Sequence, residues 1–252
     1  VVQPQVSDAD SKDKAQQALE AGNREYYAGN LENAIAHYRR CLELDPDLQV
    51  AQYNLGVVLG DCDRSEEAIE QLREFLKKEP DNAAAYQSLG YVFANLKNFS
   101  EAVACLQKAI ALRPDYAQAH FNLGMILLRM GELARGFAES EWRWQTPEFT
   151  PFESPHPMWD GRELPKATLL LHTEQGAGDA IQFARYIPLV APKFQKIILV
   201  CTAELMPLLQ TVDGVDQIML PGKISVSDFD TYAPLMSLPH ILGTTLQTVP
   251  AN

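Results

Sequence analysis

The sequence has few cysteines, few basic residues and no long apolar run. Cys41, Cys62, Cys105 and Cys201 form no C-x-x-C pair, so a secreted disulfide framework is not indicated, and we expect small buried thiols in a cytoplasmic protein. No apolar run approaches the roughly 20 residues that cross a bilayer. Lysine and arginine number 21 against 33 aspartate and glutamate, a net charge of −12. Because clustered cations bind a phosphate backbone, this balance argues against nucleic acid and favours a protein or peptide partner.

Histidine is also scarce, and the five histidines are scattered without the spacing of metal ligands, so no metal site is predicted. Residues 1–14 are polar, contain Pro4 and lack the apolar segment of a signal peptide, which predicts a disordered lead-in. The function is therefore expected to reside in the chain after residue 14.

What the sequence does contain is a repeat. Small residues and helix-ending prolines recur with a period of 34 residues through the first half of the chain. A fixed period of this length is typical of stacked structural units. The recurring positions are Gly22, Gly56, Gly90 and Gly124, then Ala34, Ala68 and Ala102, and then Pro46, Pro80 and Pro114.

This pattern resembles the tetratricopeptide repeat, in which Leu-Gly, an alanine twelve residues later and a closing proline define a pair of helices. The glycine and alanine are expected where the two helices cross, because only small side chains let backbones approach closely. Apolar residues four apart, such as Leu55 and Leu59, give each first helix a core-facing stripe. We predict an α-solenoid over residues 15–145 that holds an extended polypeptide. Its repeats are expected at 15–48, 49–82, 83–116 and 117–150.

The fourth repeat departs from the pattern. Gly136 stands where alanine is expected, and no proline closes the second helix. Terminal repeats are commonly atypical because one of their faces has no neighbour to cover it. We interpret Trp142 and Trp144 as a hydrophobic cap or a dock for the next domain, in preference to a ligand cage.

The concave wall of such a solenoid is lined by the first helices and forms the predicted peptide groove. Asn54 and Asn122 precede Leu-Gly pairs two repeats apart, with Ser88 and Glu20 at the equivalent positions. This resembles part of the asparagine ladder of O-linked N-acetylglucosamine transferases, whose amides both donate to and accept from a peptide backbone. The alternative is that these asparagines are exposed helix residues without a partner. Further groove candidates are Asn23, Tyr26, Tyr27, Tyr53, Asn95, Phe121 and Arg129, whose aromatic members could instead pack between neighbouring helices.

A connector follows at residues 146–165. Five prolines and Gly161 interrupt any helical period, and Phe149, Phe152, Met158 and Trp159 are too apolar to remain in water. We therefore expect the connector to strap one domain against the other.

Residues 166–252 change to an α/β pattern, with apolar runs that predict strands alternating with short helices. This order is typical of a Rossmann-like half domain with a parallel sheet, in which ligands bind at the carboxyl ends of the strands. The loop after the first strand is therefore the candidate site, although its glycines could serve turn geometry alone and Asp179 could be a helix cap. The strands are expected at 167–173, 196–202, 216–220 and 230–236.

Three segments carry a second resemblance: W-D-G at 159–161, L-L-L-H-T-E-Q-G-A-G-D-A-I-Q-F-A-R-Y-I-P at 169–188 and F-D-T-Y-A-P-L-M-S-L-P at 229–239. They look like bacterial proteins in which tetratricopeptide repeats precede a GT-B, heptosyltransferase-like glycosyltransferase. The resemblance implies that Asp179 is the general base on an acceptor hydroxyl, with His172 and Glu174 as further catalytic candidates. It assigns the acceptor pocket to Gln175, Gly176, Gly178 and Gln182.

One feature departs from the GT-B pattern. Such enzymes have two Rossmann-like halves, and after Ser237 only a short tail remains, so the donor half is missing. Unless the chain is part of a longer protein, no sugar transfer is expected. No cofactor is predicted for this chain, whereas a full-length enzyme would use a nucleotide sugar. The alternatives are a non-enzymatic adaptor, which could form oligomers, and a small nucleotide-binding protein that uses the EQGAGD loop.

Overall fold

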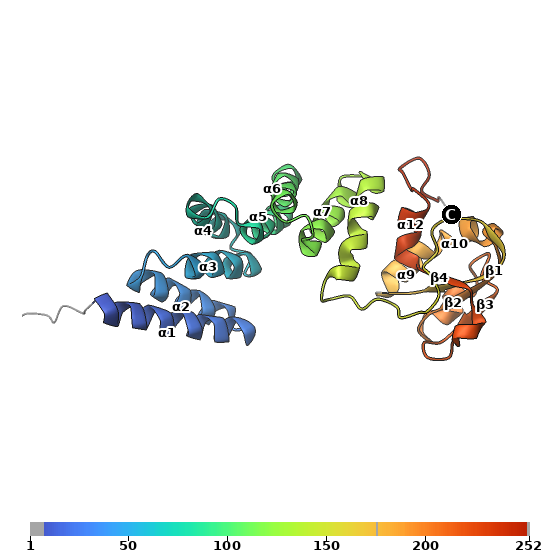
Figure 1. Cartoon of the computed structure of the whole chain (residues 1–252), viewed down its shortest axis with the longest axis horizontal. Coiled ribbons are helices and arrows are strands. Elements are labelled where there is room, and N and C mark those ends of the chain that lie inside the picture. Colours follow the sequence, from blue (N-terminus) through green and yellow to red (C-terminus); the bar gives the residue numbers. More distant parts are fainter. Residues whose placement is uncertain (1–7, 175, 251–252) are drawn as a thin grey trace, which may run out of the picture. The chain divides into compact units, whose positions relative to one another are not determined.

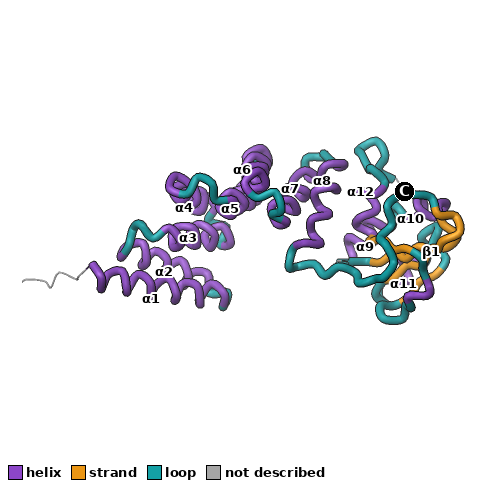
Figure 2. The backbone as a smooth tube through the Cα atoms, viewed as in Figure 1, coloured by secondary structure: helices purple, strands orange, loops and turns teal. Residues whose placement is uncertain are grey.

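The structure is a computed structural model that describes residues 8–174 and 176–250. It comprises two compact units, which divide between Ile126 and Leu127. The first unit consists of helices, and the sheet lies in the second unit (Figure 1, Figure 2).

Helical hairpins build the first unit, because α1 pairs with α2, α3 with α4 and α5 with α6. Each hairpin turns through a residue with a positive φ angle at the same place in the repeat: Gly29 at 79°, Asp63 at 59° and Lys97 at 58°. The next equivalent position is Gly131, at 82°. Only two of these four left-handed positions are glycine, so sequence inspection alone does not identify them. The helices are α1 (Asp8–Tyr27), α2 (Leu31–Leu44), α3 (Gln49–Asp61), α4 (Ser65–Lys78), α5 (Ala83–Asn95), α6 (Phe99–Leu112) and α7 (Ala117–Arg129).

The repeating glycines of the first three hairpins lie where the two helices cross, as predicted. A methyl group added at any of the three would overlap the side chain sixteen residues later, on the second helix. The equivalent alanines, Ala34, Ala68 and Ala102, are completely buried. The added methyl carbon would lie 2.6 Å from the Tyr38 ring at Gly22, 2.7 Å from Leu72 Cγ at Gly56 and 2.6 Å from Leu106 Cγ at Gly90.

Helix α1 begins at Asp8, within the range 1–14 for which the sequence predicts a disordered lead-in. The first turns carry no apolar stripe, which is why the sequence gives no sign of them. Polar contacts support them instead: Ser11 Oγ donates to the Leu44 carbonyl at 2.9 Å, and Lys14 pairs with Asp10 at 2.7 Å. Residues 1–7 lie outside the described residues.

The second unit begins with the end of α7 and with α8 (Leu133–Ser140), followed by the 3-10 helix η1 (Glu141–Gln145). A methyl group at Gly136 would lie 2.8 Å from the backbone nitrogen of Leu128, so this position has no room even for alanine. That explains the departure of the fourth repeat from the alanine pattern. Phe137 is buried against Phe183, at 6.3 Å between ring centroids, and joins the core of the second unit.

Four parallel strands form the sheet, in the order β3-β2-β1-β4, which confirms the predicted fold class. Leu169, Leu170 and Leu171 on β1 are completely buried, because both faces of the sheet are covered. The strands are β1 (Leu164–His172), β2 (Phe194–Val200), β3 (Gln217–Met219) and β4 (Thr231–Pro234). The short helices are α9 (Ala177–Ala184), α10 (Ile187–Val190), η2 (Ala191–Lys193), α11 (Met206–Leu209), η3 (Val226–Asp228), η4 (Leu235–Ser237) and α12 (Leu238–Ile241).

The connector packs onto the sheet of its own unit. Met158 forms a parallel bridge with Tyr232, and the Trp159 N–H donates to the Tyr232 carbonyl at 2.8 Å. Thr231 Oγ1 donates to the Pro157 carbonyl at 2.8 Å, and the Trp159 side chain is buried. The apolar residues of the connector therefore help to form the core of the second unit. That the connector also holds one domain against the other stays a prediction.

Among the helices of the described residues, none is both long enough and apolar enough to cross a membrane.

Candidate functional site

A cavity lies at the carboxyl end of β1, the place where the sequence predicts a site. Its volume is about 480 Å³. One wall is the end of β1 and the loop after it, and the other is the connector together with the last turn of η1. The cavity is lined by Trp144, Glu148, Phe149, Thr150, Pro151, Phe152, Glu153, His172, Thr173 and Glu174.

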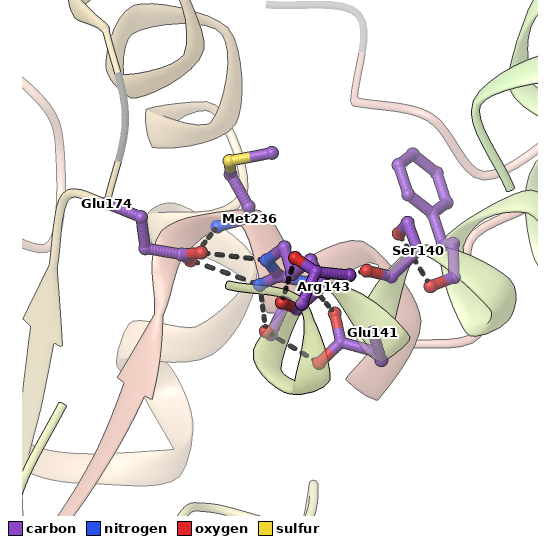
Figure 3. A network of polar contacts seen from close by, with 8 residues as sticks. Ser140, Glu141, Arg143, Glu174 and Met236 are labelled. Atoms are coloured by element: carbon purple, nitrogen blue, oxygen red, sulfur yellow. Dashed lines mark hydrogen bonds and ion pairs between the residues drawn. The ribbon is translucent and has the colours of Figure 1, made fainter. Parts of the chain in front are cut away.

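Beside this cavity, a buried arginine organises a polar network (Figure 3). Arg143 is completely buried and forms a two-pronged ion pair with Glu174, at 2.9 Å from Nε and 3.2 Å from Nη2. Its Nη1 donates to Glu141 at 2.6 Å, and its Nη2 donates to Ser237 Oγ at 2.8 Å. Ser237 Oγ in turn donates to Glu141 at 2.9 Å. The network thus joins η1, the loop after β1 and η4.

The catalytic candidate Glu174 belongs to this network. Besides Arg143, its carboxylate accepts the Met236 N–H at 3.3 Å. Burial raises the pKa of Glu174, against the opposing effect of the Arg143 guanidinium. Because both carboxylate oxygens are engaged, the geometry favours Glu174 as an anchor for the loop.

His172, the last residue of β1, is 7% exposed and stacks on Phe152, with ring centroids 4.7 Å apart and planes inclined by 26°. Burial lowers its pKa to about 4, a hydrogen bond to the Thr173 backbone opposes this effect, and the positive charge of Arg143 adds to it. At neutral pH the ring is therefore uncharged, and it can accept a hydrogen bond as well as donate one.

Trp144 also lines the cavity. Its ring lies under the Arg143 guanidinium at 4.3 Å and meets Phe149 edge-on at 6.4 Å between centroids. Its indole Nε1 is buried and has no hydrogen-bond partner among the described residues, and the same holds for His172 Nε2. The cap or dock interpretation of Trp144 did not anticipate that it would line a cavity.

The remaining candidates follow on α9 and are not among the residues that line the cavity. Gly176 and Gly178 have open space where a side chain would lie, so packing within the chain does not require glycine there. Asp179, in the first turn of α9, is partly exposed, and Gln182 is exposed one turn later on the same face. Gln175 lies outside the described residues.

Sequence reasoning missed Arg143 and Ser237. Ser237 lies 94 residues after Arg143 and carries no local pattern. The one available signal is the position of Arg143 between two tryptophans, in a helix end already expected to be buried. A cation in such a place needs acidic partners, and Glu174 was within the predicted loop.

The first unit contains a second candidate site. Asn23 and Tyr26 on α1, with Tyr53 and Asn54 on α3, line a cavity of about 210 Å³. Asn23 Oδ1 accepts from the Tyr38 hydroxyl at 2.8 Å and from Asn54 Nδ2 at 3.0 Å. Successive first helices are therefore linked through an amide cluster. The other lining residues are Tyr27, Tyr38 and Val57.

The other groove candidates occupy the same kind of helix. Tyr53 and Ser88 face one another at 3.4 Å between hydroxyl oxygens, and Asn122 Oδ1 accepts from Gln118 Nε2 at 3.1 Å. These contacts give the asparagines and serine partners within the chain. Phe121 is partly buried on α7, and Glu20 is exposed on α1. Asn95 is exposed at the end of α5, and Arg129 is exposed at the end of α7, in the second unit.

Comparison with known families identifies the helical part. A family model described as TPR repeat matches residues 22–62 and 94–131, and one described as tetratricopeptide repeat matches residues 63–104. Residues 22–131 are tetratricopeptide repeats. A parallel sheet with helices follows these repeats, and neither family model matches it.

Solved structures resemble the chain at low sequence identity. An O-GlcNAc transferase mutant from Thermobaculum terrenum is 20% identical with a TM-score of 0.50, and the match covers 85% of this chain and 42% of the transferase chain. A thermophilic TPR protein from Thermus thermophilus is 20% identical with a TM-score of 0.50, covering 54% of this chain and 75% of that one. The MamA protein is 28% identical with a TM-score of 0.47, covering 52% and 72%. No curated protein sequence matches the chain.

Proposed function

We propose that the tetratricopeptide unit binds an extended polypeptide through the side chains of its first helices. The amide cluster of Asn23 and Asn54 beside the 210 Å³ cavity carries this proposal. Both lone pairs of Asn23 Oδ1 are used, which leaves the Asn23 NH₂ group and the Asn54 carbonyl without partners among the described residues. A peptide backbone offers the carbonyl and the N–H that these groups need, whatever its sequence.

Tyrosines give the same surface an apolar component. Tyr27 is 87% exposed and lies edge-on to Tyr26, with 5.8 Å between ring centroids. Tyr26 is fixed in turn by a hydrogen bond from its hydroxyl to Asp61 at 2.8 Å. Burial raises the pKa of Tyr26, so its hydroxyl stays protonated at neutral pH. Fixed aromatic rings beside amides suit a partner that presents side chains and backbone together.

The double substitution Asn54→Ala and Asn122→Ala should weaken binding of an extended peptide by about tenfold or more, because each lost neutral hydrogen bond contributes about 1 kcal/mol. A fluorescein-labelled, unstructured Ser/Thr-rich peptide serves as the probe, and fluorescence anisotropy measures its affinity. Circular dichroism should show an unchanged helical signal.

The matched control for this double variant replaces two exposed amide residues on second helices, Asn33→Ala and Gln107→Ala. The control should bind the peptide as the unaltered protein does. Equal affinity of the control and the Asn54/Asn122 variant, or no binding by the unaltered protein, contradicts the proposed groove.

We also propose that the second unit is the acceptor-side half of a glycosyltransferase-like domain. Support comes from the shared fold with an O-GlcNAc transferase over 85% of this chain. The match spans 42% of the transferase chain. Sugar transfer by this protein, and its use of a nucleotide-sugar donor, are therefore part of what we propose. Asp179 is assigned as the general base because it is partly exposed in the first turn of α9, after a loop whose glycines leave open space.

In a protein that joins this unit to a donor-binding half, Asp179→Asn should lower the turnover of sugar transfer to a bound peptide by about 100-fold or more, since it removes the proton acceptor. The peptide affinity should stay the same. The control Arg185→Gln alters an exposed residue at the other end of α9, outside the candidate site, and should retain most of the turnover. Unchanged turnover in Asp179→Asn would mean that Asp179 is not the general base and only stabilises the N-terminus of α9.

A further inference from the structure

The cavity between α1 and α3 is walled mainly by tyrosine. Four of its seven lining residues are tyrosines, and the whole chain has nine. Tyrosine is therefore concentrated at this one place in the fold. The cavity volume of about 210 Å³ is smaller than the roughly 300 Å³ at which pockets for drug-sized ligands begin, and it suits a single side chain of a larger partner. The tyrosines are Tyr26, Tyr27, Tyr38 and Tyr53.

The accessible tyrosine rings come from two helices and lie at different angles. Tyr26 and Tyr27 on α1 have ring centroids 5.8 Å apart and planes inclined by 61°. Tyr53 on α3 packs against Phe75, at 5.4 Å between ring centroids. The face of an aromatic ring carries partial negative charge, so several rings around a small space attract a cation.

The charged residues beside the cavity are mainly acidic. Asp61 Oδ2 accepts the hydroxyl of Tyr26 at 2.8 Å, and Asp61 forms no ion pair with another described residue. Glu20 is exposed on α1, one turn before Asn23. No lysine or arginine is among the lining residues, and Arg24, the cation next to Asn23 in the chain, is exposed outside the lining. A positively charged group therefore finds carboxylates beside the cavity and no cation within its lining.

Two amide side chains add hydrogen-bonding groups to the lining. Because Asn54 Nδ2 donates to Asn23 Oδ1, the Asn54 carbonyl and the Asn23 NH₂ group point to no partner among the described residues. Neither is one of the buried atoms that lack a partner, so both can be reached from solvent. The Asn54 carbonyl can accept from an ammonium or guanidinium N–H, and the Asn23 NH₂ group can donate to a backbone carbonyl beside that cation.

Other kinds of side chain match this lining less well. An anionic group would lie against the negative ring faces and near Asp61, and no cation lines the cavity to pair with it. An uncharged apolar group would cover the rings but would leave the Asn54 carbonyl and the Asp61 charge without a partner. A basic group engages the rings, the carbonyl and the carboxylate together.

We propose that the cavity between α1 and α3 is a pocket for the basic side chain of a lysine or arginine in the bound polypeptide. The cationic group lies against the faces of Tyr26, Tyr27 and Tyr53 and donates to the Asn54 carbonyl, with Asp61 supplying the opposite charge. This inference rests on the proposed polypeptide binding and adds to it a preference for a segment with a basic residue at this position. The net charge of −12 on the chain favours the approach of such a segment.

Nuclear magnetic resonance of the full chain, with ¹³C in the tyrosine rings, tests the pocket without any peptide. The probes are N-acetyl-lysine N-methylamide and N-acetyl-arginine N-methylamide, with the norleucine and glutamate equivalents as uncharged and anionic comparisons. At least one basic probe should move the Tyr27 and Tyr53 signals in a saturable manner, and more than either comparison does. Tyr91, which is exposed on α5 and does not line the cavity, should keep its signal in place. Single Tyr→Phe variants assign the signals.

A substitution at Tyr27 tests the ring face. Tyr27 is 87% exposed, so Tyr27→Leu removes the ring without disturbing the core, and binding of the basic probe should weaken about threefold or more. Tyr27→Phe keeps the ring face and should weaken binding less than Tyr27→Leu does. The matched control is Tyr91→Leu, which should bind as the unaltered protein does.

A second substitution tests the charge. Asp61→Asn removes the negative charge and keeps an oxygen for the Tyr26 hydroxyl, so binding of the basic probe should again weaken about threefold or more, while the norleucine probe is unaffected. The control Asp81→Asn changes the net charge equally at an exposed residue outside the lining and should have no such effect.

Peptides extend the test to the polypeptide itself. Two fluorescein-labelled, unstructured Ser/Thr-rich peptides differ only in one central residue, lysine in one and norleucine in the other. The lysine peptide should bind about threefold or more tightly by fluorescence anisotropy, and Tyr27→Leu should remove this difference.

Two results would overturn the pocket. One is that neither basic probe moves the Tyr27 and Tyr53 signals more than the norleucine and glutamate probes do. The other is equal affinity of the lysine and norleucine peptides, which leaves the groove intact without a basic preference. Saturable binding of a basic probe, with no binding of either peptide, would support the pocket and contradict the groove, so the two failures are distinct.

Discussion

Replacing Arg143 with methionine should lower the free energy of unfolding of the second unit by about 3–5 kcal/mol. The substitution preserves most of the side-chain volume but leaves Glu141 and Glu174 close together without their shared cation. Glu174 is only 3% exposed at its side chain, so water cannot replace the guanidinium. Removing one partner of a buried ion pair is costly for this reason, even where the intact pair contributes little.

Urea denaturation followed by tryptophan fluorescence measures this loss. Trp142, Trp144 and Trp159 are the only tryptophans and lie in the second unit, so the signal reports that unit. The control Arg135→Met removes an exposed arginine that pairs with Glu132 one turn away and should change stability by less than about 1 kcal/mol.

Compensating substitutions separate the charge effect from packing. Adding Glu141→Gln and Glu174→Gln to Arg143→Met removes the unpaired charges, so the triple variant should recover part of the lost stability. A loss of less than about 1 kcal/mol in Arg143→Met alone would show that the network does not stabilise the fold.

The second large effect concerns pH. His172 has a pKa of about 4 in the folded chain against 6.5 for an unperturbed histidine. Between these values the unfolded chain binds a proton that the folded chain does not, so acid favours unfolding. The stability of the second unit should therefore be fully retained above pH 6.5 and fall as the pH drops toward 4, by at most about 3 kcal/mol from this residue.

Comparison of the unaltered protein with His172→Phe isolates this contribution, because other titrating groups, including Glu174 with its raised pKa, are common to both. Urea denaturation at a series of pH values measures the free energy of unfolding of both proteins. As the pH falls, this free energy should decrease less for His172→Phe than for the unaltered protein. His240→Gln, which replaces an exposed histidine, is the matched control. If the free energy of unfolding depended on pH in the same way in both proteins, His172 would be taking up a proton while it stays buried.

The sequence predicts those parts of the fold that depend on short-range periodicity. The glycine at each helix crossing follows from the 34-residue period, and the buried strand from the run of leucines at 169–171, because each pattern has one physical cause close by in the chain. The first turns of α1 escaped prediction since they depend on Ser11 bonding to a carbonyl 33 residues away.

The candidate site was predicted less completely. His172 and Glu174 were located because ligand sites occur at strand ends. Arg143 and Ser237 were not, because their roles arise from contacts across 31 and 94 residues. The unpartnered indole of Trp144 likewise has no local signature. Sequence patterns thus indicated the place of the site, and tertiary packing determined which groups meet there.

The bridge between Met158 and Tyr232 has a consequence for how the sheet can grow. On β4, the backbone N–H and carbonyl of Tyr232 are already paired with the connector. On the opposite side of the sheet, β3 is three residues long and borders no further strand among the described residues. An unprotected sheet border readily recruits another chain, and a short border does so least. An additional strand would have to displace the connector from Tyr232 to pair with the middle of β4, and at β3 it would find only three residues to pair with.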